Sequence, residues 1–148
     1  MVIPFLNFEP THKLLKQEMQ AAFENVYDSN WYILGDELAA FEKLYSQFNQ
    51  VNYTIGVSNG LDALQLALTI AGVKSGDEVI VPSNTYIATW LAVSFLGAIP
   101  VPVEPNIETC NLDPDKIETA LTEKTGAAVY RPGVCRTCRA IACACRWA

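Results

Sequence analysis

Strand-like runs and apolar helices alternate along residues 53–103, and this alternation limits the fold more than any other feature of the sequence. Residues 53–57, 78–81 and 99–103 are short and rich in Val, Ile and Tyr, and they predict strands. Residues 61–71 and 86–96 have helical spacing but are apolar on almost every side, so we expect both helices to be buried. Parallel strands joined by buried helices are typical of a sheet that is covered on both faces.

Shorter signals complete the expected order of elements. Residues 10–27 carry an apolar stripe at helical spacing, and a second amphipathic helix is expected to begin near Asp36. Asp113 before Pro114 is typical of a helix start, because Asp caps the helix and Pro suits its first position. Three strands make only part of such a sheet. The fold class expected is therefore α/β, with an incomplete, mostly parallel sheet flanked by helices.

The junction before the first buried helix reads Ser58-Asn59-Gly60-Leu61-Asp62. Asn59 is a good N-cap, Asp62 can complete a weak capping box, and Gly60 lets a ligand approach the backbone closely. The first N–H groups of a helix lack partners within it, and the helix dipole there favours an anion. We therefore expect a phosphate at the N–H groups of Gly60, Leu61 and Asp62, provided that the Asp62 carboxylate turns back towards Asn59.

An ordinary helix start that binds nothing would account for the same five residues. Neither the Gly-Lys-Ser/Thr ending of a Walker loop nor a G-x-G-x-x-G fingerprint is present. Tyr86 adds a second indication, because it follows the predicted strand at residues 78–81, at the edge where open parallel sheets bind ligands. Its ring suits stacking on a flat heteroaromatic cofactor. The alternative is that Tyr86 is an ordinary residue of the first helical turn.

Several motifs occur in a fixed order and together point to one family. They are Trp31-Tyr32-Ile33-Leu34-Gly35, Phe41-Glu42, residues 56–64, residues 76–82, Thr85 and residues 97–101. This order resembles the DegT/DnrJ/EryC1/StrS aminotransferases, pyridoxal-phosphate enzymes that place an amino group on nucleotide-linked keto sugars. Within that family the motifs are most similar to the dTDP-3-amino-3,6-dideoxyhexose transaminases. The resemblance extends from about residue 3 to residue 125, roughly the first third of a family member.

The resemblance implies the large domain of the aspartate-aminotransferase type, working as a homodimer with sites at the subunit boundary. It implies pyridoxal 5'-phosphate (PLP) as the cofactor, with the phosphate at Asn59, Gly60, Leu61 and Asp62. It also implies that Tyr86 stacks on the pyridine ring. The substrates implied are a nucleotide-linked keto sugar and an amino-acid donor, glutamate in most relatives.

The residues that carry out transamination are not found by this resemblance. The reaction needs a lysine that bonds the cofactor and moves protons, and an acid that pairs with the pyridine nitrogen. In the family both lie beyond the region of resemblance. The lysines of this chain lie in a polar turn, on polar helix faces or at a helix end: Lys13, Lys16, Lys43, Lys74, Lys116 and Lys124. We therefore assign no catalytic residue and expect this chain alone to be inactive.

The composition changes abruptly near the end of the sequence. All four arginines and four of the five cysteines lie within residues 131–148, and no acidic residue follows Glu123. We expect residues 1–125 to be the N-terminal part of the large domain and residues 126–148 to be a non-family tail. A frameshift near residues 125–130 with early termination would produce such a tail.

Two alternatives to a truncated aminotransferase remain. The chain can be a non-enzymatic fragment or interaction module. Its tail can also be a metal-binding module, since Cys135-x2-Cys138-x4-Cys143-x-Cys145 begins with zinc-like spacing.

Charge and apolar length narrow the class of protein. The formal net charge of −6 and the pI near 4.7 argue against nucleic acid or an anionic membrane as partner. The most apolar stretch, residues 87–103, is shorter than the roughly 20 residues that a membrane-spanning helix needs. The first residues lack a basic start followed by a long apolar run, so no signal peptide is predicted and we expect a cytoplasmic protein.

Overall fold

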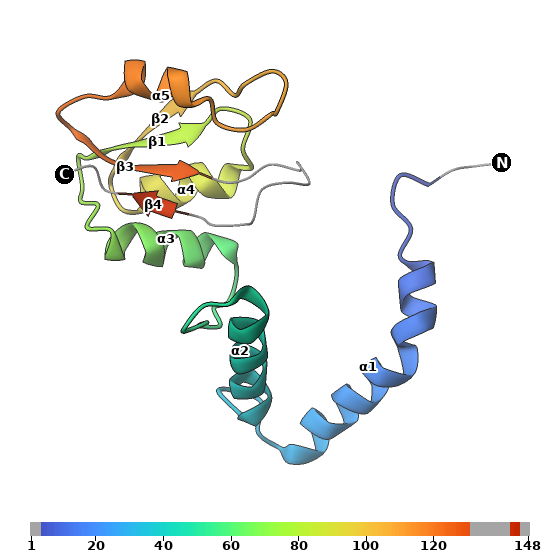
Figure 1. Cartoon of the computed structure of the whole chain (residues 1–148). Coiled ribbons are helices and arrows are strands. Elements are labelled where there is room, and N and C mark those ends of the chain that lie inside the picture. The colour runs from blue at the N-terminus through green and yellow to red at the C-terminus, as the bar shows by residue number, and fades with distance from the viewer. Residues whose placement is uncertain (1–3, 131–142, 146–148) are drawn as a thin grey trace. The chain divides into compact units, whose positions relative to one another are not determined.

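The computed structural model describes residues 4–129 and the backbone of residues 130 and 143–145. The chain divides into two compact units, Met1–Gly56 and Val57–Ala148 (Figure 1). The first unit contains helix α1, Glu9–Ser29, and helix α2, Asp36–Asn49. Both predicted amphipathic helices are confirmed, and α2 begins at the expected residue.

The predicted strand at residues 53–57 is wrong. The segment follows α2 and is bonded to it: the Gly56 N–H donates to the Glu42 carboxylate at 2.8 Å, and the Ser46 hydroxyl donates to Thr54 Oγ1 at 2.8 Å. No described strand pairs with it, and Tyr53 and Ile55 are exposed. β-branched and aromatic composition favours a strand only where a neighbouring strand is present, so composition alone misled the prediction.

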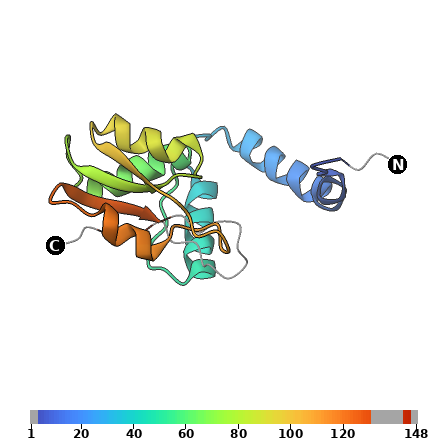
Figure 2. The ribbon, with the colours of Figure 1, turned by 90° about the horizontal axis from the view of Figure 1, so that it is seen from above.

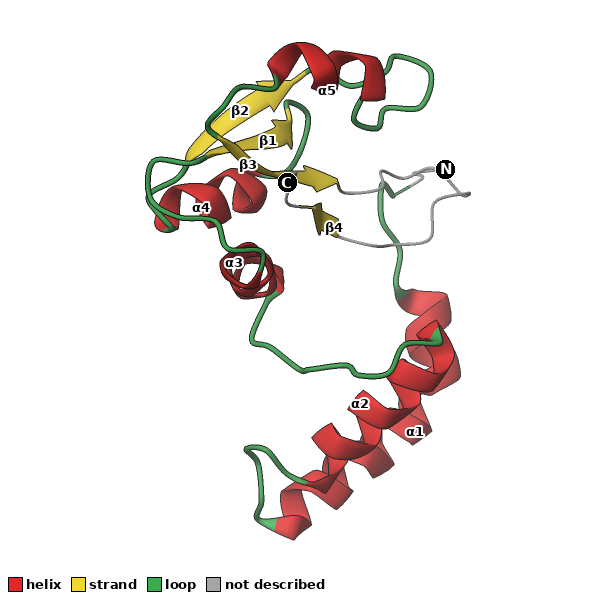
Figure 3. Ribbon diagram, turned by 60° about the vertical axis from the view of Figure 1, so that its left-hand side comes forward, coloured by secondary structure: helices red, strands yellow, loops and turns green. Residues whose placement is uncertain are grey.

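The second unit is built on a four-stranded sheet. Its strands are β1 (Glu78–Pro82), β2 (Ile99–Val103), β3 (Thr125–Tyr130) and β4 (Cys143–Cys145). They lie in the order β2-β1-β3-β4 (Figure 3). β1 is parallel to both of its neighbours, and β4 is antiparallel to β3. The strands predicted at residues 78–81 and 99–103 are confirmed.

Helices cover both faces of this sheet. Helices α3 (Gly60–Ile70) and α4 (Ile87–Phe95) lie on one face, and α5 (Pro114–Ala120) lies on the other (Figure 3). Seen from above, α5 lies in front of the strands (Figure 2). The predicted helix closures are also present, with Gly72 and Gly97 at φ values of 83° and 70°. The expected α/β class, a mostly parallel sheet flanked by helices, is confirmed.

Alternating side chains of the strands divide the core into two clusters. On β1, Val79 and Val81 pack towards Leu68 of α3 and Val93 of α4, whereas Ile80 packs on the opposite side. The second cluster gathers around Ile80 under α5, with Val103, Leu112 and Ala128. All three β1 residues have an exposed fraction of 0%, as expected for a strand buried on both faces.

Strand β3 extends past the domain boundary that the sequence predicted after residue 125. Ala127 pairs with Val79 and Ala128 pairs with Ile80, and Ala127 is completely buried. Residues 126–130 therefore belong to the sheet. Gly126, Ala127 and Ala128 gave no strong strand signal, although the small side chains of Ala127 and Ala128 are buried in the sheet.

The predictions about the tail fall mainly on residues 131–142 and 146–148, which lie outside the described residues, as do Cys135 and Cys138. Within the described residues, no cluster of three or more His, Cys, Asp or Glu side chains could hold a metal ion. No helix in the described part of the chain has the length and apolar character needed to cross a membrane.

Ile80→Ala is expected to lower the free energy of unfolding by about 2–5 kcal/mol, because it leaves a cavity under α5. Ile107→Ala is the matched control, since that side chain is 91% exposed, and it should change the free energy by less than about 0.5 kcal/mol. Urea denaturation followed by circular dichroism measures both. Equal losses in the two variants would contradict the two-layer core.

Candidate functional site

Two helices of the second unit begin at the same edge of the sheet. α3 and α4 pack against each other, and both start on the side where β1 and β3 end (Figure 1). The fold therefore brings the Ser58–Asp62 junction and Tyr86 to one edge of one unit. This is the edge at which parallel sheets bind ligands.

Asn59 caps α3 as the sequence predicted. Its backbone is extended, with φ −164° and ψ 173°, and its Oδ1 accepts a hydrogen bond from the Asp62 N–H at 3.0 Å. The first bond of the helix backbone follows, from the Ala63 N–H to the Asn59 carbonyl at 3.2 Å. The side-chain cap thus fixes where the helix begins.

The Asp62 carboxylate turns back from the helix towards the loop. Its Oδ2 accepts from the Ser58 hydroxyl and, at 3.2 Å, from Asn59 Nδ2. A standard capping box would place this carboxylate on the Asn59 backbone N–H, whereas here it binds the side-chain amide. The predicted phosphate site required the Asp62 carboxylate to turn back towards Asn59, and the structure shows this orientation.

The expectation of three free N–H groups is wrong at Asp62, because Asn59 Oδ1 occupies that N–H. For Gly60 and Leu61, the described residues supply no hydrogen-bond acceptor to the backbone N–H. A Cβ built on Gly60 would contact nothing beyond its chain neighbours and its own helix, so the space beside Gly60 is open. Two N–H donors without an acceptor among the described residues, at a helix N-terminus, fit a phosphate group.

Tyr86 lies one position before α4, not in its first turn as the alternative interpretation held. It is the N-cap residue, with φ −65° and ψ 145°, but its side chain makes no capping bond. The side chain is 71% exposed and has no aromatic partner among the described rings. The ring is therefore open to contact with a flat ligand.

The loop that carries Tyr86 is held at three points. The Ser83 N–H donates to the Val103 carbonyl at 2.9 Å, and Asn84 Nδ2 donates to the Cys110 carbonyl at 3.1 Å. The Thr85 and Thr89 hydroxyls lie 2.9 Å apart, and Thr89 is buried. The sequence carries no signal for the role of Asn84, because its partner lies 26 positions further along the chain and no local pattern connects the two residues.

The lysines of this unit lie away from the start of α3. Lys74 and Lys124 precede β1 and β3, at the opposite edge of the sheet. Lys116 belongs to α5 on the other face, and its Nζ lies 3.6 Å from the Asp113 carboxylate. None of the three is positioned to bond a ligand that sits at the Gly60 N–H.

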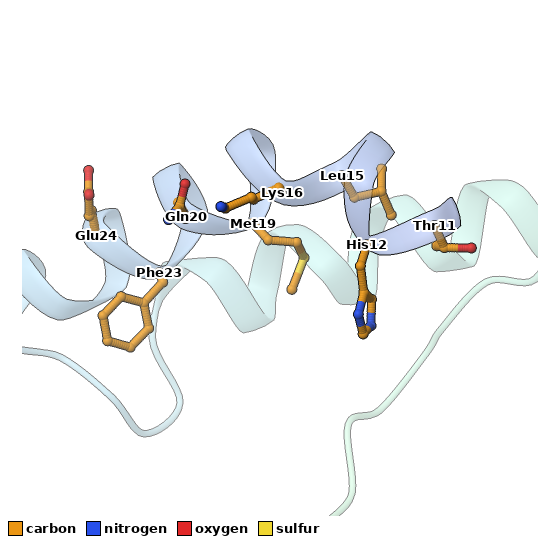
Figure 4. Close-up of a pocket in the computed structure, with 8 residues that line it drawn as sticks. All are labelled: Thr11, His12, Leu15, Lys16, Met19, Gln20, Phe23 and Glu24. Atoms are coloured by element: carbon orange, nitrogen blue, oxygen red, sulfur yellow. The ribbon is translucent and has the colours of Figure 1, made fainter. Parts of the chain in front are cut away.

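A hollow in the first unit is lined by one helix alone. Its residues all belong to α1: Thr11, His12, Leu15, Lys16, Met19, Gln20, Phe23 and Glu24 (Figure 4). His12, the only histidine of the chain, stacks on Phe8 with ring centroids 5.8 Å apart. Side chains of a single helix face do not enclose a ligand, so this hollow is not the candidate site.

Comparison with known proteins agrees with the motif order. Residues 13–132 match the model of the DegT/DnrJ/EryC1/StrS aminotransferase family. A dTDP-3-amino-3,4,6-trideoxy-alpha-D-glucose transaminase from Streptomyces venezuelae is 49% identical over 84% of this chain and 33% of its own length. A dTDP-3-amino-3,6-dideoxy-alpha-D-galactopyranose transaminase from Aneurinibacillus thermoaerophilus is 49% identical over 85% of this chain and 35% of its own. The chain thus spans about a third of these relatives.

Solved structures show the same fold. DesV from S. venezuelae superposes with a TM-score of 0.81 at 48% identity, covering 85% of this chain and 34% of DesV. The Bacillus subtilis protein ntda, solved with bound cofactor PMP, has a TM-score of 0.80 at 34% identity, over 85% of this chain and 29% of its own. The family match reaches residue 132, as the position of β3 in the sheet suggests.

Asn59→Ala is expected to lower the free energy of unfolding by about 0.5–2 kcal/mol, because the Asp62 N–H loses its acceptor at the start of α3. Asn59→Ser is the matched control, since a serine hydroxyl also caps helices, and it should recover most of the loss. Urea denaturation measures both variants. A serine variant as unstable as the alanine variant would show that the cap contributes nothing.

Proposed function

The chain belongs to the DegT/DnrJ/EryC1/StrS aminotransferase family, and on that premise we propose that it takes part in transferring an amino group to a nucleotide-linked keto sugar. PLP is the cofactor of this family, and an amino acid is the proposed donor. One observation carries the proposal: no described residue accepts a hydrogen bond from the N–H groups of Gly60 and Leu61, which begin α3 at the carboxyl edge of the sheet.

We assign the cofactor phosphate to the start of α3. The N–H groups of Gly60 and Leu61 donate to phosphate oxygens, and the helix dipole stabilises the negative charge. Asn59 contributes indirectly, because its cap fixes the position of the first turn. The Asp62 carboxylate is bonded to Ser58 and Asn59, so it is directed towards its own loop.

We assign the pyridine ring to Tyr86. Its exposed ring offers a flat surface at the edge where α3 begins, and the bonded loop before it keeps that surface in place. When bound, PLP supplies the electron sink that amino transfer needs. The residues of this chain orient the cofactor by holding the phosphate and supporting one face of the ring.

The substrate and assembly are part of the same proposal. Relatives with 49% identity are named for dTDP-linked sugars, so a dTDP-linked keto hexose is the first substrate to test. We also propose a homodimer in the cytoplasm. Residues 1–130 are proposed to be the N-terminal part of a large domain, five residues longer than the sequence alone indicated, because β3 belongs to the sheet.

We propose that the 148-residue polypeptide does not catalyse transamination by itself. The lysines of the second unit lie at the opposite edge or on the other face of the sheet, and the chemistry needs one at the cofactor. An assay with glutamate and a dTDP-linked keto hexose should show no product above the rate in buffer. The S. venezuelae transaminase is the positive control, and turnover by the polypeptide would contradict the proposal.

Gly60→Pro tests the phosphate site directly. Proline removes the N–H at the first helical position but is tolerated there, and the extended backbone of Asn59 suits a following proline. The affinity for pyridoxamine phosphate, measured by fluorescence titration, should fall about tenfold because a charge-assisted hydrogen bond is lost. The affinity for pyridoxamine, which has no phosphate, and the free energy of unfolding should not change.

Equal affinity of the unaltered chain for pyridoxamine phosphate and pyridoxamine would contradict the phosphate assignment. That result would favour the alternative of a non-enzymatic interaction module.

A further inference from the structure

We propose that Asp62 is a positioning residue, whose carboxylate holds Ser58 and Asn59 so that the N–H groups of Gly60 and Leu61 point at the cofactor phosphate. The inference rests on the proposed function, because it concerns the same helix start. It assigns Asp62 a different role from the one expected from the sequence, in which the Asp62 N–H itself would contact the phosphate.

Hydrogen bonds join Asp62 to Ser58 and Asn59, the two residues that precede Gly60 and Leu61. Asp62 Oδ2 accepts from the Ser58 hydroxyl and from Asn59 Nδ2, and the Asp62 N–H donates to Asn59 Oδ1. Ser58 Oγ and Asn59 Nδ2 are also 3.2 Å apart. Gly60 and Leu61 lie between the residues that these bonds join. We call this set of hydrogen bonds among Ser58, Asn59 and Asp62 the clamp, and it fixes the backbone that carries the N–H groups of Gly60 and Leu61.

The hydrogen bonds of Asp62 matter because Gly60 is exposed and has no side chain to pack. Glycine has the widest conformational freedom of any residue, and the space where a Cβ at position 60 would lie is open beyond its own helix and chain neighbours. If the loop were unclamped, binding would have to order it, and the cost of ordering would reduce affinity. The hydrogen bonds of Asp62 order the loop before the ligand arrives.

The charge of Asp62 acts in the opposite direction, because a carboxylate repels a phosphate. Two donors and the helix N-terminus stabilise this negative charge, so we infer that positioning outweighs repulsion. The two effects can be separated by substitution. Asp62→Asn keeps a carbonyl oxygen that can accept from Ser58 and Asn59 but removes the charge, whereas Asp62→Ala removes both.

The experiment measures the affinities of the full chain for pyridoxamine phosphate and for pyridoxamine by fluorescence titration. Asp62→Ala should reduce the preference for the phosphate form about tenfold, and Asp62→Asn should restore most of it. Asp77→Ala is the matched control: its carboxylate also accepts from a backbone N–H, that of Lys74 at 2.8 Å, but at the opposite edge of the sheet. It should leave the preference unchanged.

Tighter binding of the phosphate form by both Asp62 variants would overturn the inference, because repulsion would then be the larger effect. An equal loss of the preference for the phosphate form in both variants would also overturn the inference, because hydrogen bonding by the neutral Asn amide would then not maintain that preference. If the unaltered chain shows no preference for the phosphate form, the proposed function fails, and a measurement without ligand decides the positioning role.

That measurement is the 15N–1H spectrum of the ligand-free chain. The Gly60 and Leu61 amide signals should broaden or move in Asp62→Ala and return to their original positions in Asp62→Asn. Unchanged signals in Asp62→Ala would overturn the positioning role independently of any ligand.

Discussion

Burial of β1 on both faces is the constraint on which the rest of the second unit depends. Val79, Ile80 and Val81 are all inaccessible to solvent, so helices must cover the strand from two sides. Parallel neighbours require connections that return across a face of the sheet, and α4 and α5 provide the connections between the described parallel strands. α4 follows the end of β1, and α3, which leads into β1, begins at the same edge (Figure 1). The same burial that stabilises the core therefore gathers helix N-termini, and with them anion-binding groups, at one edge.

The sequence predicted the parts of this unit that local chemistry determines. Periodic apolar spacing identified α3 and α4, and the capping preference of Asn59 identified where α3 begins. The sequence-based prediction of secondary structure failed where a strand depends on a partner that is distant in the sequence. Residues 53–57 have strand composition but bond to α2, whereas residues 126–130 have little strand character but fill a place beside β1. Strand pairing depends on the tertiary structure, so local patterns in a single sequence do not predict it.

The candidate site shows the same division between local and distant information. Spacing alone indicated that Asn59 and Asp62 cap one helix start, and the structure agrees. The sequence also indicated that the Asp62 carboxylate turns towards Asn59, but it did not indicate the bond from Ser58 or that the Asp62 N–H would be occupied. The bond from Asn84 to Cys110 behind Tyr86 had no sequence signal, because it joins two loops that only the folded sheet brings together.

The central claim is that the start of α3 receives the phosphate of a pyridoxal cofactor. The most direct test is a 15N–1H titration of the chain with pyridoxamine phosphate, following every backbone amide. The account predicts the largest shift changes at Gly60 and Leu61, with little change at Lys74 and Asp77 on the opposite edge of the sheet. Saturation with the largest changes elsewhere in the chain, or with none at Gly60 and Leu61, would contradict it.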